Sequence, residues 1–180
     1  MTWRMMKAVL ILPGTAVVLV PGLIIWAAAG TDFGGPVSPP GVIRLWAGLG
    51  GLGLGGLGLG IFGLGICFGF WTASLFVTIG KGTPAPWDPP KKLVIRGPYR
   101  HVRNPMITSV LLMLLGEALT LQSWPIGWWG LFFFAANSVY FPLSEEKGLE
   151  RRFGDDYRTY KANVPRWVPR LTAWRPPDES

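Results

Sequence analysis

The chain has 180 residues and a formal net charge of +7; 49% of its residues are hydrophobic, 15% are charged and ten are tryptophan. A domain of this size cannot bury so much apolar surface in water, so we expect an all-α integral membrane protein. The cations gather beside apolar segments, as at the cytoplasmic ends of membrane helices, which argues against nucleic-acid binding. Cys67 and His101 are the only cysteine and histidine, which excludes an internal disulfide and leaves too few ligands for a zinc or iron site.

The first predicted span runs from about Lys7 to Ala29, and Pro13 and Pro21 should bend it. At about twenty residues it exceeds the apolar core of a cleaved signal peptide, which favours a retained membrane anchor over a signal peptide. The Gly/Pro-rich stretch 31–41 follows and has almost no positive charge, so we predict that it lies on the outer side.

The second apolar run, Val42–Ile79, is too long for one perpendicular crossing. As a single helix it would measure about 57 Å, against a hydrocarbon core of about 30 Å. It is therefore either one long helix that projects into the cytoplasm or a helix that breaks near its glycines. One crossing is preferred, because it leaves the basic loop 80–103 on the inner side with the N-terminus.

This second run carries a glycine tract from Gly48 to Gly60, with more glycines up to Gly69. In lipid such a sequence is held helical, because its backbone groups have no other partners. Small residues four positions apart let another helix or a ligand approach closely. The pairs with this spacing are Gly51/Gly55, Gly56/Gly60 and Gly65/Gly69. Helix packing is the favoured interpretation, and contact between the last glycines and a cofactor is the alternative.

Two shorter apolar segments, Met106–Leu121 and Ile126–Phe141, are predicted to form a helical hairpin joined by Gln122–Pro125. The proline-rich stretch 82–90 before them is predicted to be a loop. About four transmembrane helices result, and this number places both termini on the cytoplasmic side.

An amphipathic helix is predicted after Pro142, lying against the membrane surface. Its apolar face has helical spacing and consists of Leu149, Phe153, Tyr157 and Tyr160. Two prolines, Pro165 and Pro169, should end the helix, and two tryptophans, Trp167 and Trp174, should anchor the tail at the interface.

Charged residues cluster at both ends of the predicted hairpin, in 96–105 and in 145–157. A helical hairpin returns the chain to the side from which it started, so the two clusters can meet at one membrane face. Such a meeting favours a site for a small charged cofactor.

Within these clusters, Glu145 and Glu146 can accept hydrogen bonds from the hydroxyls and amine of a nucleoside-bearing cofactor. Arg100 and Arg103 can bind its carboxylate or phosphate. One alternative is that the acids only form salt bridges with the cations of the other cluster. Another is that the two acids open a helix for which Ser144 is the N-cap.

Three other polar residues are candidates for a functional role. Glu117 lies in an apolar segment, where a carboxylate is a functional candidate, although its place near the hairpin turn equally allows a bond to a turn amide. Asn137 is a weaker case of the same kind. His101 has the chemistry of a general base, but beside several arginines a loop role is favoured.

The motif Arg96-Gly-Pro-Tyr-Arg-His-Val-Arg-Asn-Pro105 is followed by the apolar hairpin and then by Glu145-Glu146, Leu149, Phe153-Gly154, Tyr157 and Tyr160. This order resembles the integral-membrane methyltransferases, which include isoprenylcysteine carboxyl methyltransferase and the phospholipid N-methyltransferases. The resemblance covers roughly Gly82–Arg170. It implies that residues 80–170 form the cofactor-binding region of a single membrane domain, of which residues 1–79 supply the N-terminal spans.

The resemblance also implies an activity: S-adenosyl-L-methionine-dependent transfer of a methyl group to a lipid-like acceptor that enters from the bilayer. The accepting group would be an amine, a carboxylate or a thiol. The cofactor site would lie on the cytoplasmic side, and no metal is implied.

Site residues carry over from the family position by position. Arg103, Asn104 and Pro105 stand where the prenylcysteine enzymes have Arg-His-Pro, so an asparagine replaces the histidine. The acidic pair Glu145-Glu146 matches the pair assigned to the cofactor. The implied cofactor-binding set is Tyr99, Arg100, His101, Arg103, Asn104, Pro105, Glu145, Glu146, Gly63 and Gly65, the last two as the match to a Gly-x-Gly motif.

Two residues are candidates for the reaction itself. Glu146 would take a proton from the acceptor, and Arg152 would pair with the acceptor's carboxylate or phosphate. The chain departs from the family pattern Pro-x-Tyr-x-Gly, because Ile107 and Ser109 replace the tyrosine and the glycine.

Two other functions remain open at this point. An NADPH-dependent membrane reductase has a similar C-terminal architecture, and a non-catalytic scaffold would retain the fold without the site. The departures at Ile107 and Ser109 are the best support for the scaffold. The reductase is disfavoured, because the extra spans and the polycyclic acceptor pocket expected of it are not evident in 180 residues.

Overall fold

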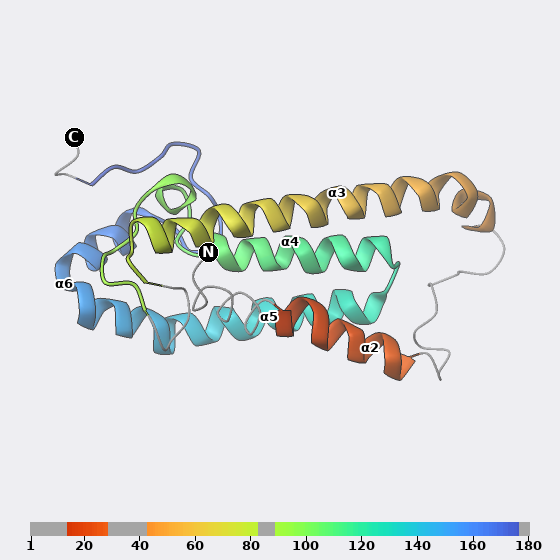
Figure 1. Ribbon diagram of the computed structural model, residues 1–180, viewed down its shortest axis with the longest axis horizontal. Helices are drawn as coiled ribbons and strands as arrows, with labels where there is room; N and C mark the ends of the chain where they lie inside the picture. Colours follow the sequence, from red (N-terminus) through yellow and green to blue (C-terminus); the bar gives the residue numbers. More distant parts are fainter. Residues whose placement is uncertain (1–13, 29–42, 83–88, 177–180) are drawn as a thin grey trace. The chain divides into compact units, whose positions relative to one another are not determined.

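The computed structural model describes residues 14–28, 43–82 and 89–176, and all regular structure in these ranges is helical (Figure 1). This confirms the predicted all-α class for the described part of the chain. The predicted outer loop 31–41 and the start of the first span lie outside the described residues, as does most of the proline-rich loop. The elements in chain order are η1 (Thr15–Leu19), α2 (Val20–Ala28), α3 (Ile43–Thr78), η3 (Gly97–Arg100), α4 (Pro105–Thr120), α5 (Trp124–Tyr140), η4 (Phe141–Glu145) and α6 (Glu146–Asn163).

One helical segment in the described ranges, Gly53–Thr78 within α3, is long and apolar enough to cross a bilayer. Thr15–Ala27 and Pro105–Thr120 are apolar but shorter. A span of the hydrocarbon core needs about 20 apolar residues unless the bilayer thins or the helix stops short of the far side. The four predicted spans therefore stay a prediction.

The long second run is one continuous helix of 36 residues, α3, and does not break at its glycines. Its length is about 54 Å at 1.5 Å per residue. Of the two alternatives that the sequence left open, the single long helix is the one adopted. An unbroken helix satisfies every interior backbone group internally, which a glycine-rich segment in lipid requires.

The chain divides into two compact units. The helix unit contains the described residues up to Cys67 together with Ser109–Ala135. The site unit contains Phe68–Thr108 and the chain from Ala136 onward.

In the helix unit, a small core forms between the single turn of η1 and the middle of α4. Its buried residues are Ala16, Val17, Val110 and Leu114, and the partly buried Phe62, Met113, Trp129 and Phe133 pack against them.

A π-helical turn, η1, precedes Pro21 in the first span and leaves one carbonyl oxygen available to another helix. The predicted bends at Pro13 and Pro21 stay a prediction, and Pro13 lies outside the described residues. In the π-helix η1, each backbone N–H bonds to the carbonyl oxygen five residues earlier, as Val20 N–H does to Thr15 O. The donor for the next carbonyl, Ala16 O, would be Pro21, which has no N–H. Ala16 O is thereby left without that helical partner. It accepts a hydrogen bond from Trp129 Nε1 at 2.9 Å, which ties η1 to α5.

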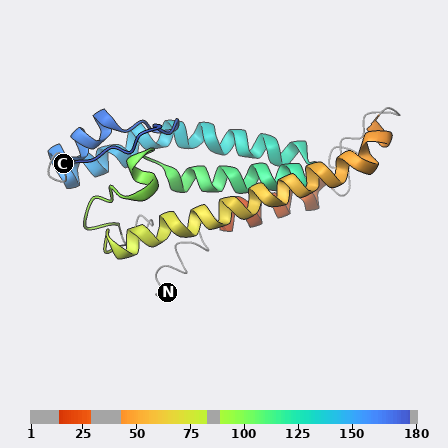
Figure 2. The ribbon, with the colours of Figure 1, turned by 90° about the horizontal axis from the view of Figure 1, so that it is seen from above.

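Glycines bring α3 and α4 into close contact, and both views show the two helices side by side (Figures 1 and 2). A Cβ on Gly58 would lie 2.6 Å from Thr120 N and 2.7 Å from Gly116 O. A Cβ on Gly65 would lie 2.9 Å from Ser109 O. Gly58 and Gly65 are two helical turns apart, so they share one face.

Helix packing, the favoured interpretation of the tract, is therefore confirmed for Gly65. The predicted pair Gly56/Gly60 makes no such contact among the described residues, because neither residue has an atom within 4 Å of an added Cβ. Gly55 is equally open, and the side chain position of Gly51 lies outside the described residues. The contact is set by a seven-residue repeat, as in helices that pack nearly antiparallel.

The hairpin is confirmed within one or two residues, as α4 and α5. Its loop is shorter than predicted, because Trp124 and Pro125 already belong to α5. A proline fits the first turn of a helix, where its missing N–H would have no helical partner. Gln122 takes the turn with a φ of 49°.

The helix after the hairpin departs from its prediction in two ways. It does not begin anew at Glu145, since α5, η4 and α6 follow one another without a gap and no side chain caps α6. The N-cap interpretation of Ser144 was therefore wrong. The helix also breaks at Gly154, whose φ of 56° and ψ of −128° are not helical.

The apolar face of α6 is covered by the protein itself. Tyr157, Tyr160 and Val164 are buried, and the partly buried residues packed against them are Leu93, Ile95, Leu149, Phe153 and Trp174. The prediction that this face rests on the membrane surface was wrong for these residues. Trp174, predicted as an interfacial anchor, instead lies 5.9 Å from the Tyr160 ring, because the tail folds back over the helix.

Candidate functional site

The loop that carries the first charged cluster is held against the end of α3 in the site unit. Gly97 has a φ of +54°, and a Cβ there would lie 3.2 Å from the Trp71 ring. Only glycine accepts this backbone conformation without strain. The turn sends Tyr99 into the unit, where it is buried and its ring lies edge-on to Phe76 at 5.4 Å.

The chain after α6 returns along this loop, and we call Val164–Trp174 the C-terminal strap. Three backbone hydrogen bonds tie it to the loop: Arg103 N to Pro165 O at 2.9 Å, Arg170 N to His101 O at 2.9 Å, and Trp174 N to Arg100 O at 3.0 Å. A loop and a strap bonded at three successive points form a rigid frame.

His101 belongs to this frame. Its Nδ1 lies 2.7 Å from Arg170 O, and because a carbonyl oxygen can only accept, Nδ1 carries the proton. The Tyr160 hydroxyl adds a bond to Tyr99 O at 2.7 Å from the side of α6. The favoured structural role of His101 is therefore supported by both of its strap contacts.

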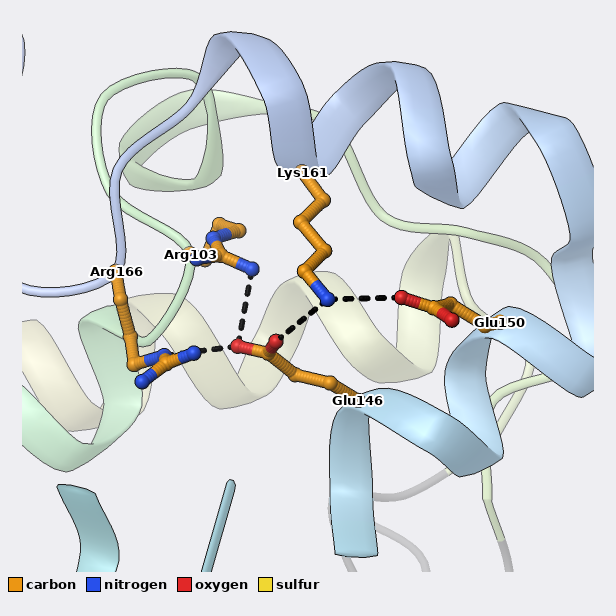
Figure 3. Close-up of polar contacts among 5 residues, drawn as sticks. All are labelled: Arg103, Glu146, Glu150, Lys161 and Arg166. Atoms are coloured by element: carbon orange, nitrogen blue, oxygen red, sulfur yellow. Dashed lines mark hydrogen bonds and ion pairs between the residues drawn. The ribbon is translucent and has the colours of Figure 1, made fainter. Parts of the chain in front are cut away.

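Three cations and a second carboxylate cluster around Glu146, as Figure 3 shows. Glu146 Oε1 receives Arg103 Nη1 at 2.9 Å and Arg166 Nε at 2.8 Å. Glu146 Oε2 lies 3.2 Å from Lys161 Nζ, which also contacts Glu150 Oε1 at 2.8 Å. The Glu146 side chain is 3% exposed and that of Arg103 10%, so this pair is buried.

The environment keeps Glu146 ionised. Burial alone would raise its pKa, but hydrogen bonds from Arg166 and Lys161 and the charges of Arg103 and Arg166 outweigh burial and hold the pKa below its ordinary value. Neighbouring Tyr157 responds in the opposite sense. Burial and the Glu146 charge raise the pKa of its hydroxyl to about 12, so Tyr157 stays neutral.

Several buried donors of the loop in the site unit have no hydrogen-bond partner among the described residues. They are the Tyr99 hydroxyl, Arg103 Nε and Asn104 Nδ2. Glu146 Oε2 likewise has no partner beyond the ion pair with Lys161. A buried polar group left unpaired costs about 1–3 kcal/mol, so a group of them next to a buried ion pair is typical of a binding site.

The predicted site residues separate into those that gather here and those that do not. Tyr99, Arg103, Asn104 and Glu146 lie in the loop and at the start of α6, and Pro105 begins α4. The Glu145 side chain is exposed and is absent from the contacts of Glu146. The predicted acidic pair therefore presents its two carboxylates to different surroundings.

Four further predicted residues lie elsewhere. Arg152 is exposed, and its guanidinium lies 5.8 Å from the centre of the Phe153 ring. Gly63 and Gly65 belong to the helix unit, where Gly65 contacts α4 and Gly63 faces open space. Arg100 donates from Nε to Ile95 O at 3.2 Å, within its own loop.

Glu117 lies in the helix unit and its Oε2 is buried without a hydrogen-bond partner among the described residues. The turn amide of Leu121 bonds to the backbone oxygen of Glu117, not to its carboxylate. No group of three or more metal-ligating side chains occurs in the described ranges.

Sequence reasoning missed two members of the cluster, Lys161 and Arg166. In an unbroken helix, Lys161 would lie about 22 Å along the axis from Glu146, out of reach of its carboxylate. The break at Gly154 turns the second half of α6 back, and Lys161 then reaches both Glu146 and Glu150. A glycine inside an otherwise regular helical pattern was the signal that could have indicated this break.

Comparison with known proteins matches residues 55–156 to the phospholipid methyltransferase family. The match covers more than half of the chain, so the protein belongs to this family. A protein of Haemophilus influenzae described as uncharacterized is 41% identical over 64 residues, which are 35% of this chain and 100% of that protein. The family segment includes Arg103 and Glu146, whereas Lys161 and Arg166 follow it.

Proposed function

We propose that this protein catalyses S-adenosylmethionine-dependent transfer of a methyl group to a lipid-like acceptor held in a membrane. The observation that carries the proposal is the buried Arg103–Glu146 pair, which joins the loop before the hairpin to the helix after it, together with the unpaired buried polar atoms of the same unit. The family supports methyl transfer to a lipid-like molecule; the cofactor and the site are our inference.

The residues present fit this cofactor. S-adenosylmethionine carries a carboxylate, an ammonium group, two ribose hydroxyls and an adenine ring with acceptor nitrogens. The unpaired donors of Tyr99, Arg103 and Asn104 suit its acceptors, and Glu146 Oε2 suits a hydroxyl or the ammonium group. Three cations face two carboxylates in the cluster, an excess of one positive charge that suits the cofactor's carboxylate.

When bound, S-adenosylmethionine supplies an electrophilic methyl group on its sulfonium. The chain's own task is to hold the partners in line and keep water out. The ion pair with Glu146 orients the guanidinium of Arg103. Asn104, which directly precedes α4, supplies a side-chain amide. Because the pKa of Glu146 is lowered, the carboxylate is a weak base, and we assign it to binding rather than to proton removal.

The acceptor and the membrane complete the proposal. The accepting atom would belong to an amine, carboxylate or thiol on a molecule that enters from the bilayer. Arg152, exposed on α6, is available for the acceptor's phosphate or carboxylate. The site unit would lie on the cytoplasmic side with both termini, since it carries most of the basic residues.

The test is the thermal stability of the detergent-purified protein with S-adenosylmethionine, S-adenosylhomocysteine or NADPH. A ligand at a hundred times its dissociation constant stabilises the folded state by about 2.7 kcal/mol. We expect the two adenosyl compounds to raise the melting temperature and NADPH to leave it unchanged. Stabilisation by NADPH alone would favour the reductase, and no response to any of the three would favour the scaffold.

A matched pair of variants locates the response. Glu146→Gln keeps the shape of the side chain and removes its charge, so it should abolish most of the shift. Asp155→Asn removes a carboxylate of the same helix that pairs with the exposed Arg158, and it should leave the shift intact.

A further inference from the structure

The C-terminal strap brings a second guanidinium to the buried carboxylate from outside the family segment. Arg166 Nε lies 2.8 Å from Glu146 Oε1, the oxygen that Arg103 Nη1 also contacts at 2.9 Å. The family match ends at residue 156, ten residues before Arg166. The contact therefore comes from a part of the chain that lies outside the family match.

The contact closes a ring of four residues. The backbone N–H of Arg103 donates to Pro165 O, and the side chain of Arg103 reaches Glu146. Glu146 in turn holds Arg166, which follows Pro165 directly in the chain. In a closed ring of this kind, the position of each member constrains that of the others, so the strap and the carboxylate are fixed together.

Within the ring, the two carboxylate oxygens of Glu146 have different partners. Oε1 is occupied by two guanidinium groups, whereas Oε2 meets only Lys161, which is 39% exposed and shared with Glu150. With Oε1 held on two sides, the carboxylate cannot rotate, and Oε2 keeps its remaining capacity to accept a hydrogen bond. Arg166, unlike Lys161, has no second carboxylate among the described ion pairs.

We propose that Arg166 is a positioning residue of the site: it locks the Glu146 carboxylate so that Oε2 is presented to the ligand. The inference rests on the proposed function, since the ligand is the cofactor assigned there. It adds the C-terminal strap to the functional site and makes the site dependent on a residue that follows the family segment.

The sign of the pH effect follows from the charges around Glu146. Arg103 faces it from the loop, Arg166 from the strap, and Lys161, Glu150 and Tyr157 from α6. The lowered pKa means that the stability from these ion pairs is present above the ordinary carboxyl pKa and is lost as pH falls through the folded value. Removing Arg166 raises that folded value, so the loss should begin at a higher pH.

The experiment compares Arg166→Gln with Arg170→Gln in the full-length protein in detergent. Arg170 is on the same strap, and its side chain donates from Nη1 to Asn163 O at 2.6 Å without touching Glu146. Two quantities are measured for each variant: the affinity for S-adenosylmethionine by calorimetry, and the pH at which acid reduces the melting temperature without ligand.

We expect Arg166→Gln to weaken binding by about tenfold, the value of one charge-assisted hydrogen bond, and to shift the acid transition to higher pH. Arg170→Gln should match the wild type in both. Arg166→Lys, which keeps the charge, should recover part of the pH shift. Equal affinity and an equal acid transition in Arg166→Gln and Arg170→Gln would overturn the proposal.

The measurement without ligand distinguishes failure of the proposed function from failure of the positioning role of Arg166. If the wild type binds no S-adenosylmethionine, the proposed function fails. The acid transition then still decides whether Arg166 controls Glu146, and an unshifted transition in Arg166→Gln would overturn the positioning role by itself.

Discussion

Glu146 is the residue on which the site unit depends most directly. Its carboxylate is 3% exposed and is contacted by three cations from three segments, the loop, α6 and the strap. A buried ion pair contributes little compared with well-packed apolar residues, but removing one partner leaves the other charge uncompensated. That charge would be the guanidinium of Arg103, whose side chain is 10% exposed.

We expect Glu146→Gln to destabilise the folded protein by about 3 kcal/mol at neutral pH, because Arg103 would remain buried without its counter-charge. Asp155→Asn is the control. It breaks an exposed pair with Arg158, with side chains 90% and 67% exposed, and should change stability by less than about 0.5 kcal/mol. Chemical denaturation in detergent measures both, and equal effects would contradict the buried pair.

The advantage of the wild type over Glu146→Gln should also depend on pH. Because the pKa of Glu146 is lowered on folding, the difference should be constant above the ordinary carboxyl pKa of about 4.3 and should shrink as the solution is acidified below it. A difference that grew on acidification would mean that the folded pKa is raised.

At the scale of elements, the break in α6 decides which charged residues meet. Gly154 has a φ of 56° and a ψ of −128°, a conformation that is open to glycine and strained for other residues. No atom lies within 4 Å of an added Cβ, so the strain would come from the backbone alone.

We expect Gly154→Ala to destabilise the protein by about 1–3 kcal/mol and to weaken the Lys161 contacts with Glu146 and Glu150. Gly148→Ala is the matched control in the same helix, since Gly148 is helical and an added Cβ there also meets nothing. It should be neutral or stabilise by up to about 1 kcal/mol. Thermal unfolding distinguishes the two, and similar effects at both sites would contradict the break.

The second element-scale feature is the glycine contact between α3 and α4. Ser109, which replaces the expected family glycine, packs where Gly65 of α3 lacks a side chain. The close approach is thus provided from the other helix. Loss of the family glycine at position 109 is therefore compatible with tight packing.

We expect Gly58→Ala to disrupt the helix unit, because the new Cβ would lie 2.6 Å from Thr120 N and 2.7 Å from Gly116 O, both backbone atoms that cannot move aside alone. Gly60→Ala, on the same helix with open space, should be tolerated. The melting temperature in detergent should fall clearly only for Gly58→Ala. Equal tolerance would exclude this face as the α3–α4 contact.

At the scale of the whole molecule, the proposed single crossing of α3 makes a prediction about sidedness. In a Cys67→Ala background, Lys91→Cys and Arg175→Cys should both react with an impermeant maleimide from the cytoplasmic side only, since the basic residues favour that side. Gln122→Cys, in the hairpin turn, should not react from that side. Labelling of Lys91→Cys and Arg175→Cys from opposite sides would rule out this topology.

Much of this protein followed from local sequence patterns. Apolar run lengths predicted the hairpin α4–α5 within one or two residues. The motif around Arg103 and the acids 145–146 predicted the family, and the ion pair between the two charged clusters was one of the alternatives left open. Such features are readable because periodicity, proline chemistry and charge placement act over a few residues.

The tertiary structure alone decided how the distant parts converge. Whether Gly154 breaks α6, whether Lys161 and Arg166 reach Glu146, and what covers Tyr157 and Tyr160 depend on contacts between segments far apart in the chain. The sequence by itself determined the helices and the hairpin that separates the two charged clusters along the chain, since these follow from local physical chemistry. Lys161 and Arg166 reach Glu146 only because the loop, α6 and the strap pack together. The free energy of that packing depends on contacts between distant segments, which no local sequence pattern reports.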